Sequence, residues 1–278
     1  MGKASAQGRG RLRLHSCPAV TIGLILVLAS LGCSTVTTRD SGPGASSPAA
    51  SAKASGPLTV FAAASLTEPF NDEMAILRAS SPGLSVTFSF GGSGALVAQV
   101  QQGAPADVVA TADTASMRRL IDAGLVDPPV TFARNKLQIL VAPGDPKGVT
   151  SLADLARPDL KVVLGDESVP AGRYAAQVLQ TAGVAVRPVS KEPDVKAAVS
   201  KVTTGEADAT IVYATDVRAA GGKGQGIEIP DGQNVLADYP IAVVKATPHR
   251  AAAAAFVEAT VRGGGQAALG RRGFLPAP

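Results

Sequence analysis

The chain has 278 residues, of which 46% are hydrophobic and 17% charged, and its formal net charge is +4. Residues 1–32 hold 4 of its 26 basic residues and no acidic ones, so the rest carries 22 of each sign and offers no basic surface for nucleic acid. With 3 Tyr, 7 Phe and no Trp, the chain is also poorly supplied for stacking on bases or sugars. We therefore expect no nucleic-acid partner.

Residues 1–32 are typical of an export signal. Four basic residues precede an apolar stretch at 19–31, which is too short to remain as a membrane span. The stretch ends at Ser30-Leu31-Gly32-Cys33, which resembles a bacterial lipoprotein cleavage site. We expect lipidation of Cys33. The other cysteine, Cys17, lies inside the signal, so the mature chain has no intrachain disulfide to form.

Residues 33–57 are predicted to be a lipidated cysteine followed by a flexible tether. The segment after Cys33 consists almost wholly of small residues and proline, which bury too little apolar surface to fold. This arrangement predicts a folded part outside the cytoplasm, anchored to the cell membrane.

The folded part begins at residue 58 and alternates between strand-like and helix-like segments. Apolar, β-rich runs predict strands at 58–63, 84–90, 107–111, 136–142, 161–164, 209–213 and 239–244. Helical patterns cover 66–79, 95–102, 114–123, 151–155, 171–182, 194–203 and 250–261. The alternation predicts the α/β class with mainly parallel sheets, and the unbroken apolar strands indicate sheets covered on both faces.

Two serines lie where a strand runs into a helix. Ser65 follows the strand 58–63, and Ser93 follows the strand 84–90. Free backbone N–H groups and the positive end of a helix dipole meet at such a turn, which suits an anion. The pair suggests one ligand held from two helix ends. The alternative is that both serines are ordinary helix N-caps.

Catalytic arrangements are scarce in this sequence. The mature chain has one histidine, His249, and no cysteine besides Cys33, which removes most nucleophile–base pairs and every zinc site. One alternative is a secreted serine hydrolase, because Gly91-Gly-Ser93-Gly-Ala95 comes close to a nucleophile elbow and Asp208 and His249 follow in hydrolase order. Ala95 in place of the final glycine argues against it. We predict that the protein is not an enzyme.

Five segments together resemble the molybdate-binding proteins of bacterial ABC importers. They are Val60-Phe-Ala-Ala-Ala-Ser65-Leu-Thr, Gln102-Gly-Ala-Pro-Ala-Asp107-Val, Thr111-Ala-Asp113, Ser168-Val-Pro-Ala-Gly172 and Ile211-Val-Tyr213-Ala-Thr-Asp216. The resemblance implies a type II periplasmic binding fold, in which two α/β lobes are joined by crossover hinge strands and the ligand lies in the cleft between them. It places the first lobe at residues 58–138 plus 243–278 and the second at 139–242.

The resemblance also implies a site without cationic side chains. Ser65 and Ser93 correspond to ligands that offer hydroxyl and backbone N–H groups, Ala171 and Val195 to backbone N–H donors, and Tyr213 to a hydroxyl donor. Molybdenum would be bound as molybdate through these five residues, with no other metal and no cofactor.

The residues themselves support part of this set. Ala171 and Val195 each begin a predicted helix, so their N–H groups should be free, and Asp194 is the expected N-cap of the second of these helices. A tyrosine at a strand end, such as Tyr213, is more often a core aromatic. Gly94 stands where the family commonly has a further serine.

The resulting hypothesis is a lipid-anchored, extracytoplasmic binding protein for molybdate and tungstate. We expect it to be a monomer that delivers its ligand to the membrane subunit of an ABC permease. Fixed donors would reject a protonated ligand such as phosphate, because nothing in the site could accept the proton. The alternative within the binding class is a carrier for another oxyanion, sulfate or thiosulfate, which geometry alone would separate from molybdate.

Overall fold

The computed structural model describes residues 55–278. The predicted signal at 1–32, Cys33 and nearly all of the tether lie outside the described residues. Among the described residues, no helix combines the length and the apolar character that crossing a bilayer requires.

The first of two five-stranded sheets is assembled from both ends of the described chain. Its strands, in sheet order, are β2 (Leu84–Gly91), β1 (Gly56–Ala63), β3 (Val108–Ala110), β10 (Ala237–Val243) and β4 (Val130–Asn135). β1 pairs in parallel with β2 and β3, whereas β10 runs antiparallel to both β3 and β4. Four of its five strands therefore share one direction.

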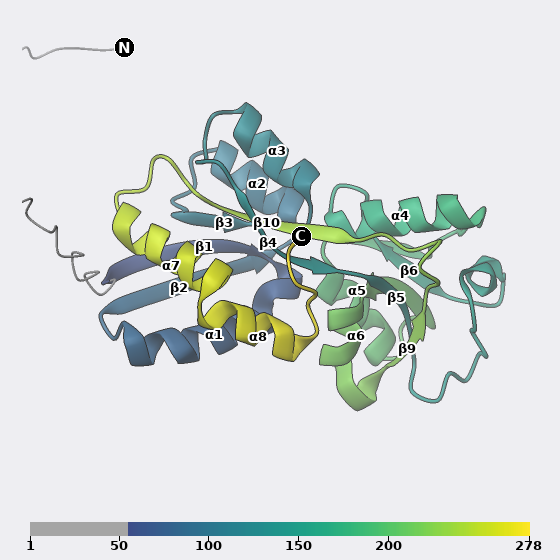
Figure 1. Cartoon of the computed structure of the whole chain (residues 1–278). Helices are drawn as coiled ribbons and strands as arrows, with labels where there is room; N and C mark the ends of the chain where they lie inside the picture. The colour runs from purple at the N-terminus through teal and green to yellow at the C-terminus, as the bar shows by residue number, and fades with distance from the viewer. Residues whose placement is uncertain (1–54) are drawn as a thin grey trace, which may run out of the picture. The chain divides into compact units, whose positions relative to one another are not determined.

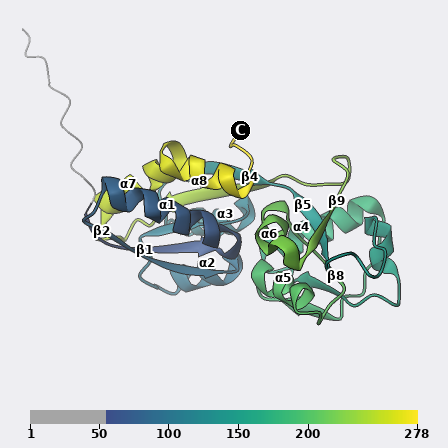
Figure 2. The ribbon, with the colours of Figure 1, turned by 90° about the horizontal axis from the view of Figure 1, so that it is seen from below.

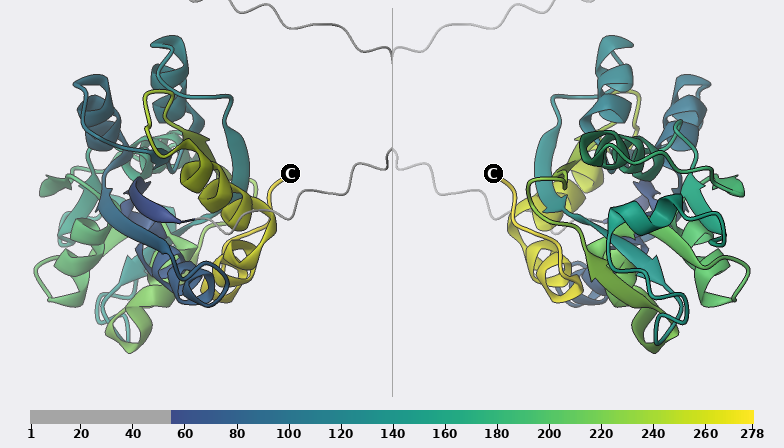
Figure 3. Two further views of the ribbon diagram at one scale, coloured as in Figure 1. Left: turned by 90° about the vertical axis from the view of Figure 1, so that its left-hand side faces the viewer. Right: turned by 90° about the vertical axis from the view of Figure 1, so that its right-hand side faces the viewer.

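Helices cover both faces of the first sheet (Figure 3). They are α1 (Thr67–Ser80), α7 (Arg250–Arg262) and α8 (Gly264–Arg272) on one face, and α2 (Ser93–Gln101) and α3 (Thr114–Asp122) on the other. Phe70 of α1 meets Phe256 of α7 edge-on, with ring centroids 5.6 Å apart, and Phe88 of β2 lies 5.8 Å from Phe70. Burying these apolar faces is the main stabilising contribution of this layer.

The second sheet uses only the middle of the chain. Its order is β7 (Ser190–Glu192), β6 (Val162–Gly165), β8 (Ala209–Tyr213), β5 (Leu137–Val141) and β9 (Gln225–Glu228). The accompanying helices are η2 (Leu152–Ala156), α4 (Pro170–Ala182), α5 (Val195–Thr203), α6 (Ala214–Ala220) and η3 (Gly221–Lys223). β5 is antiparallel to both neighbours, so four of the five strands again share one direction. We call each sheet with its helices a lobe.

Two segments connect the lobes (Figures 1 and 2). β4 leads into β5 through Lys136 alone, and residues 229–236 lead back from β9 to β10. Asn234 links the two segments, because its amide oxygen accepts from Leu137 N at 3.1 Å and its amide nitrogen donates to Leu137 O at 2.9 Å. This pairing makes the two crossings one unit.

The lobe boundaries differ from the expected 138/139 and 242/243. Sheet membership changes at Lys136 and again between Glu228 and Ala237. The strand predicted at 239–244 lies wholly in the first sheet, because β10 fills the place between β3 and β4. The return to the first lobe is thus complete before that strand begins.

The predicted α/β class is confirmed, and the predicted elements are present with small shifts at their ends. The segment at 151–155 is a 3₁₀ helix rather than an α-helix. The sequence does not predict β4, β7, β9, α6 or α8. β7 and β9 are short edge strands with polar residues, and α8 begins with two glycines, so neither periodicity nor propensity marks them.

Candidate functional site

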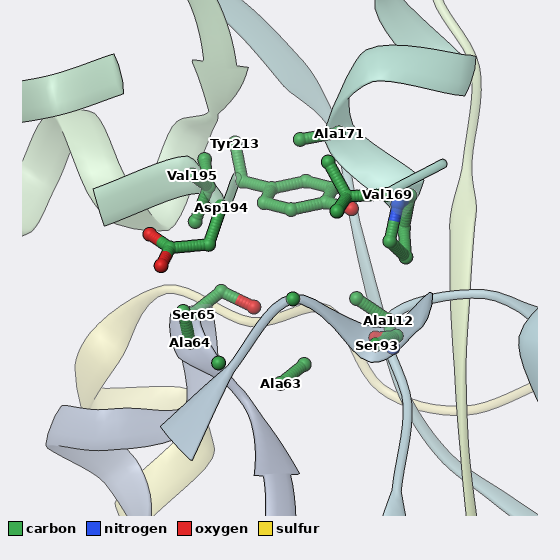
Figure 4. A pocket seen from close by; sticks show the side chains of 13 residues that line it. Ala63, Ala64, Ser65, Ser93, Ala112, Val169, Ala171, Asp194, Val195 and Tyr213 are labelled. Atoms are coloured by element: carbon green, nitrogen blue, oxygen red, sulfur yellow. Dashed lines mark hydrogen bonds between the residues drawn. The ribbon is translucent and has the colours of Figure 1, made fainter. Parts of the chain in front are cut away.

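A small cavity lies between the two lobes (Figure 4). Its volume is about 20 Å³, slightly above the roughly 10–15 Å³ that one water molecule needs. Five residues that the sequence singles out all line this cavity: Ser65, Ser93, Ala171, Val195 and Tyr213. Figure 4 shows the two serines facing Ala171, Val195 and Tyr213 of the other lobe. The structure therefore brings together the whole predicted set.

Ser65 lies in a short 3₁₀ helix, η1 (Ala64–Leu66), between β1 and α1. Leu66 is the N-cap of α1 and makes no side-chain cap bond, so Ser65 is not an ordinary cap. Its side chain is buried, with 3% exposed, and its Oγ lies 3.0 Å from the hydroxyl of Tyr239. Ser65 also lines the cavity.

Ser93 is the first residue of α2, whose N-cap is Gly92. It is also not a cap, because its Oγ accepts a hydrogen bond from Ala112 N at 3.1 Å instead of bonding its own helix. The N–H of Ala112 occupies one lone pair of this oxygen, so the hydroxyl proton of Ser93 points elsewhere. Ser93 also lines the cavity, so this proton can be donated to an anion there.

Two helices of the second lobe begin at the cavity. Val169 is the N-cap of α4 and Pro170 its first residue, so Ala171 is in the first turn. Asp194 is the N-cap of α5, where its side chain accepts from Ala197 N at 2.9 Å, and Val195 follows it. N–H groups in a first turn have no carbonyl of their own helix to bond. Both therefore offer a backbone donor and the positive end of a helix dipole.

Tyr213 ends β8 and is buried, with 1% exposed. Its hydroxyl has no hydrogen-bond partner among residues 55–278. Burial raises the pKa of this phenol well above its ordinary value, so the group keeps its proton. A buried donor without an acceptor costs free energy unless a ligand satisfies it.

The cavity wall is neutral apart from one carboxylate. Among the described residues, no lysine or arginine lines it, and the other lining residues are alanine, glycine, valine, proline, serine and tyrosine. The exception, Asp194, uses its side chain to cap α5. The arrangement can bind a small anion by hydrogen bonds and helix dipoles rather than by ion pairs.

Glycines let the two lobes touch beside the cavity. A Cβ atom at Gly92 would lie 2.5 Å from the carbonyl oxygen of Pro193, and one at Gly94 would lie 2.4 Å from that of Ser168. Both distances are shorter than real Cβ contacts. Gly94, which stands where relatives commonly have serine, thus fits the close approach of the lobes in this chain.

Two ion pairs cross between the lobes near the cavity. Arg173 of α4 donates through Nε to Asp113 at 3.0 Å, pairs with it also through Nη2, and donates to the Ser116 hydroxyl at 3.0 Å. Lys196 of α5 pairs with Glu68 of α1 at 2.8 Å. The same lysine lies 3.3 Å from Asp216, whose pKa burial raises to about 6 although Lys196 opposes the rise.

The residues of the hydrolase alternative do not assemble. The ring of His249 lies 3.2 Å from Asp107, in a different pocket from Ser93, and Asp208 accepts from Lys161 N at 2.7 Å. Neither His249 nor Asp208 is therefore placed to act on Ser93 as the general base that a hydrolase needs.

A family model of bacterial extracellular solute-binding proteins matches residues 58–275. The chain belongs to this family. It is 40% identical over 250 residues to the molybdate-binding protein ModA of Mycobacterium tuberculosis (strain ATCC 25618 / H37Rv), which covers 90% of this chain and 95% of the relative. The predicted resemblance is confirmed, and at the level of the family these relatives are substrate-binding proteins rather than enzymes.

Two solved structures show the same fold. The periplasmic molybdate-binding protein of Azotobacter vinelandii aligns with a TM-score of 0.70 at 24% identity, covering 80% of this chain and 100% of its own. The sulfate-binding protein SubI of Mycobacterium tuberculosis H37Rv also gives 0.70, at 23% identity, covering 80% and 87%. The type II periplasmic binding fold is thereby confirmed, but this likeness does not separate molybdate from sulfate.

Several residues around the site are not found by sequence reasoning. Tyr239 contacts Ser65 from 174 positions away, and Arg173 and Lys196 act across the lobes. Local motifs give no signal for such contacts, because they depend on the order of strands and on how the lobes face each other. Arg173 directly follows Ser168-Val-Pro-Ala-Gly172, and Lys196 directly follows Val195, so both lie beside positions that the sequence singled out.

Proposed function

We propose that this protein captures molybdate outside the cytoplasm and delivers it to an ABC importer in the membrane. The observation that carries the proposal is the convergence of five neutral donor positions from both lobes on one small cavity. The relative that covers nearly the whole chain is named for molybdate, and the matching family model describes extracellular proteins.

Neutral donors are sufficient to hold a tetrahedral dianion. A hydrogen bond to a charged oxygen is worth about 1.5–3 kcal/mol, so the hydroxyls of Ser65, Ser93 and Tyr213 with the N–H groups of Ala171 and Val195 supply a strong field. Helix N-termini add their dipoles. A cavity of about 20 Å³ also excludes sugars and peptides by size.

Tungstate belongs to the same proposal, because it has the charge and tetrahedral shape of molybdate. We further propose that the protein is a monomer and that a lipid on Cys33 holds it at the membrane. Replacing Cys33 with Ser should then release the protein without changing its ligand affinity. An unmodified Cys33 in a parent protein that is already soluble, seen by mass spectrometry, would remove the anchor from the proposal.

Sulfate is the second candidate, because a sulfate-binding protein shares the fold. Titration calorimetry of the described part of the chain with molybdate, tungstate, sulfate and phosphate separates the candidates. We expect molybdate and tungstate to bind much more tightly than sulfate, and phosphate to bind hardly at all. Tighter binding of sulfate than of molybdate would contradict the proposal.

A further inference from the structure

Tyr239 lies directly behind a serine of the cavity without itself lining it. It belongs to β10, is fully buried, and places its hydroxyl 3.0 Å from Ser65 Oγ. Its ring is surrounded by the edges or faces of Phe132, Tyr213 and Phe274, with centroids 6.4, 5.7 and 5.2 Å away. The phenol is therefore held in one place.

The direction of the hydrogen bond between these hydroxyls decides what Ser65 offers to a ligand. A serine hydroxyl has one proton and two lone pairs. If Ser65 donated to Tyr239, only lone pairs would be left for the cavity, and these would repel an anion. If Tyr239 donates to Ser65, the serine proton is free to point into the cavity.

Two geometric observations favour donation by Tyr239, whose phenol keeps a proton to donate because burial raises its pKa well above the ordinary value. The first is Ser93, where the direction is fixed: the backbone N–H of Ala112 can only donate, and it donates to Ser93 Oγ at 3.1 Å. The second is Tyr213, a buried phenol on the cavity wall whose hydroxyl has no hydrogen-bond partner among residues 55–278, so that it also faces this space with a proton to donate.

We infer that Tyr239 is a positioning residue that determines specificity, because by donating to Ser65 Oγ it makes this serine an obligate donor toward the cavity. Together with Ala112 N behind Ser93, it turns the proton of each serine toward the cavity. An oxyanion that carries a proton then meets a serine proton instead of an acceptor, whereas every oxygen of a fully deprotonated dianion can accept. This inference rests on the proposed function and assigns its selectivity to a residue outside the cavity.

The test is Tyr239→Phe, which keeps the ring and removes the hydroxyl. Without it, Ser65 gains a free lone pair and can rotate, so we expect molybdate to bind about 3- to 10-fold more weakly, as for the loss of one neutral hydrogen bond. Monoprotonated phosphate should lose less or gain, so the ratio of phosphate to molybdate affinity should rise by a similar factor. Both are measured by calorimetry at one pH.

A double-mutant cycle with Ser65→Ala separates this role from a merely structural one. If Tyr239 acts through Ser65, Tyr239→Phe should have no further effect in the Ser65→Ala background. Phe274→Leu is the packing control, because it disturbs the same ring without touching the hydroxyl, and it should leave the affinity ratio unchanged. Effects of Tyr239→Phe and Ser65→Ala that add, or an unchanged ratio in Tyr239→Phe, would overturn the inference.

The parent protein is titrated first, so that the two hypotheses fail separately. If it binds sulfate instead of molybdate, the proposed function is wrong, and the same cycle is run with sulfate against phosphate. If it binds molybdate but Tyr239→Phe leaves the ratio unchanged, the proposed function stands and the role of Tyr239 does not.

Discussion

The cavity and its rim use charge in opposite ways. No lysine or arginine between residues 55 and 278 lines the cavity, yet Arg173 and Lys196 cross from the second lobe to acidic residues of the first beside it. Asp113 and Glu68, their partners, belong to the first lobe. Cations are thus present near the site but are neutralised by the protein itself.

The two regions serve different purposes: the cavity recognises the ligand, and the ion pairs at its rim hold the lobes together. A cation inside the cavity would attract any anion, because Coulomb attraction depends little on direction, whereas fixed N–H and O–H groups test where each oxygen lies and whether it carries a proton. The ion pairs at the rim join the two lobes directly, so they stabilise the contact between the lobes whatever the ligand is. Five variants can break or sharpen this division.

Gly92→Ala should have the largest effect on binding. Its Cβ would meet Pro193 O at 2.5 Å, so the lobes could not approach and the three donor positions of the second lobe would be lost to the ligand. We expect roughly 100-fold weaker molybdate binding or worse. The backbone of Gly92 has φ −63° and ψ 130°, which alanine adopts freely, so folding should be unaffected.

Gly270→Ala is the control, because Gly270 lies in α8 of the first lobe and a Cβ there has no neighbouring atom within 4 Å. Small-angle scattering should show that ligand reduces the radius of gyration of the parent and of Gly270→Ala, but not of Gly92→Ala. Normal affinity in Gly92→Ala would mean that the lobes do not close in the arrangement described above.

Ser93→Ala and Ser65→Ala should have the next largest effects. Each removes one hydroxyl donor to a charged oxygen and should weaken binding by roughly 1.5–3 kcal/mol, which is about 10- to 150-fold. Ser200→Ala, at an exposed serine of α5, is the control and should bind like the parent. If both cavity variants bind molybdate as tightly as Ser200→Ala does, the proposed site is in the wrong place.

Arg173→Met should weaken binding by a smaller factor, about 3- to 10-fold, because it removes an ion pair that holds the lobes together around the ligand but removes no ligand donor. The side chain of Arg173 is 33% exposed, so salt should screen its pair with Asp113 and weaken binding in the parent more than in the variant. Arg157→Met is the control: Arg157 is 35% exposed and pairs with Asp159 inside one lobe. If Arg157→Met loses as much affinity as Arg173→Met, the loss does not come from a broken contact between the lobes.

Glu73→Gln should not change ligand affinity, but it should change how stability depends on pH. Glu73 of α1 is buried and accepts a hydrogen bond from Thr260 Oγ1 at 2.8 Å. Its burial raises the pKa of the carboxyl group from 4.5 to about 8. The folded protein therefore holds a proton that the unfolded chain releases, so the contribution to stability is full below pH 4.5 and is lost as the pH rises to about 8.

The size of this loss is on the order of a few kcal/mol, because one pKa unit corresponds to about 1.36 kcal/mol. Denaturant unfolding of the parent and of Glu73→Gln at pH 5 and pH 8 measures it. The parent should lose more stability over this range than the variant. Equal pH dependence of the two would show that Glu73 titrates normally.

The sequence predicts the parts of this molecule that local chemistry determines. Ser65, Ser93 and Asp194 each lie at a helix start that strand and helix patterns mark, and the structure places all three at the cavity. Tyr213 needed a family resemblance, because a tyrosine at a strand end is usually a core residue. The resemblance leads us to expect a serine where this chain has Gly94. In the structure, Gly94 lies so close to the carbonyl oxygen of Ser168 that a side chain would not fit.

Contacts between distant segments could not be predicted in this way. The hydrogen bond between Tyr239 and Ser65 exists because β10 enters the first sheet beside β3, and no local pattern shows this order of strands. The same cause explains the shifted lobe boundary. A strand between 239 and 244 is visible from its residues, but the sheet that it joins is not.

The place of β10 also has a consequence for how the chain acquires its structure. The second sheet is complete once residue 228 has been made, and all of its pairings lie between residues 137 and 228. The first sheet begins at residue 56 but has a gap between β3 and β4 until Ala237–Val243 is present. Pairing across so long a separation in sequence slows folding, because loop closure must come first. The lobe that is started first is therefore finished last, and a chain of this topology stays incompletely folded until nearly all of it has been synthesised.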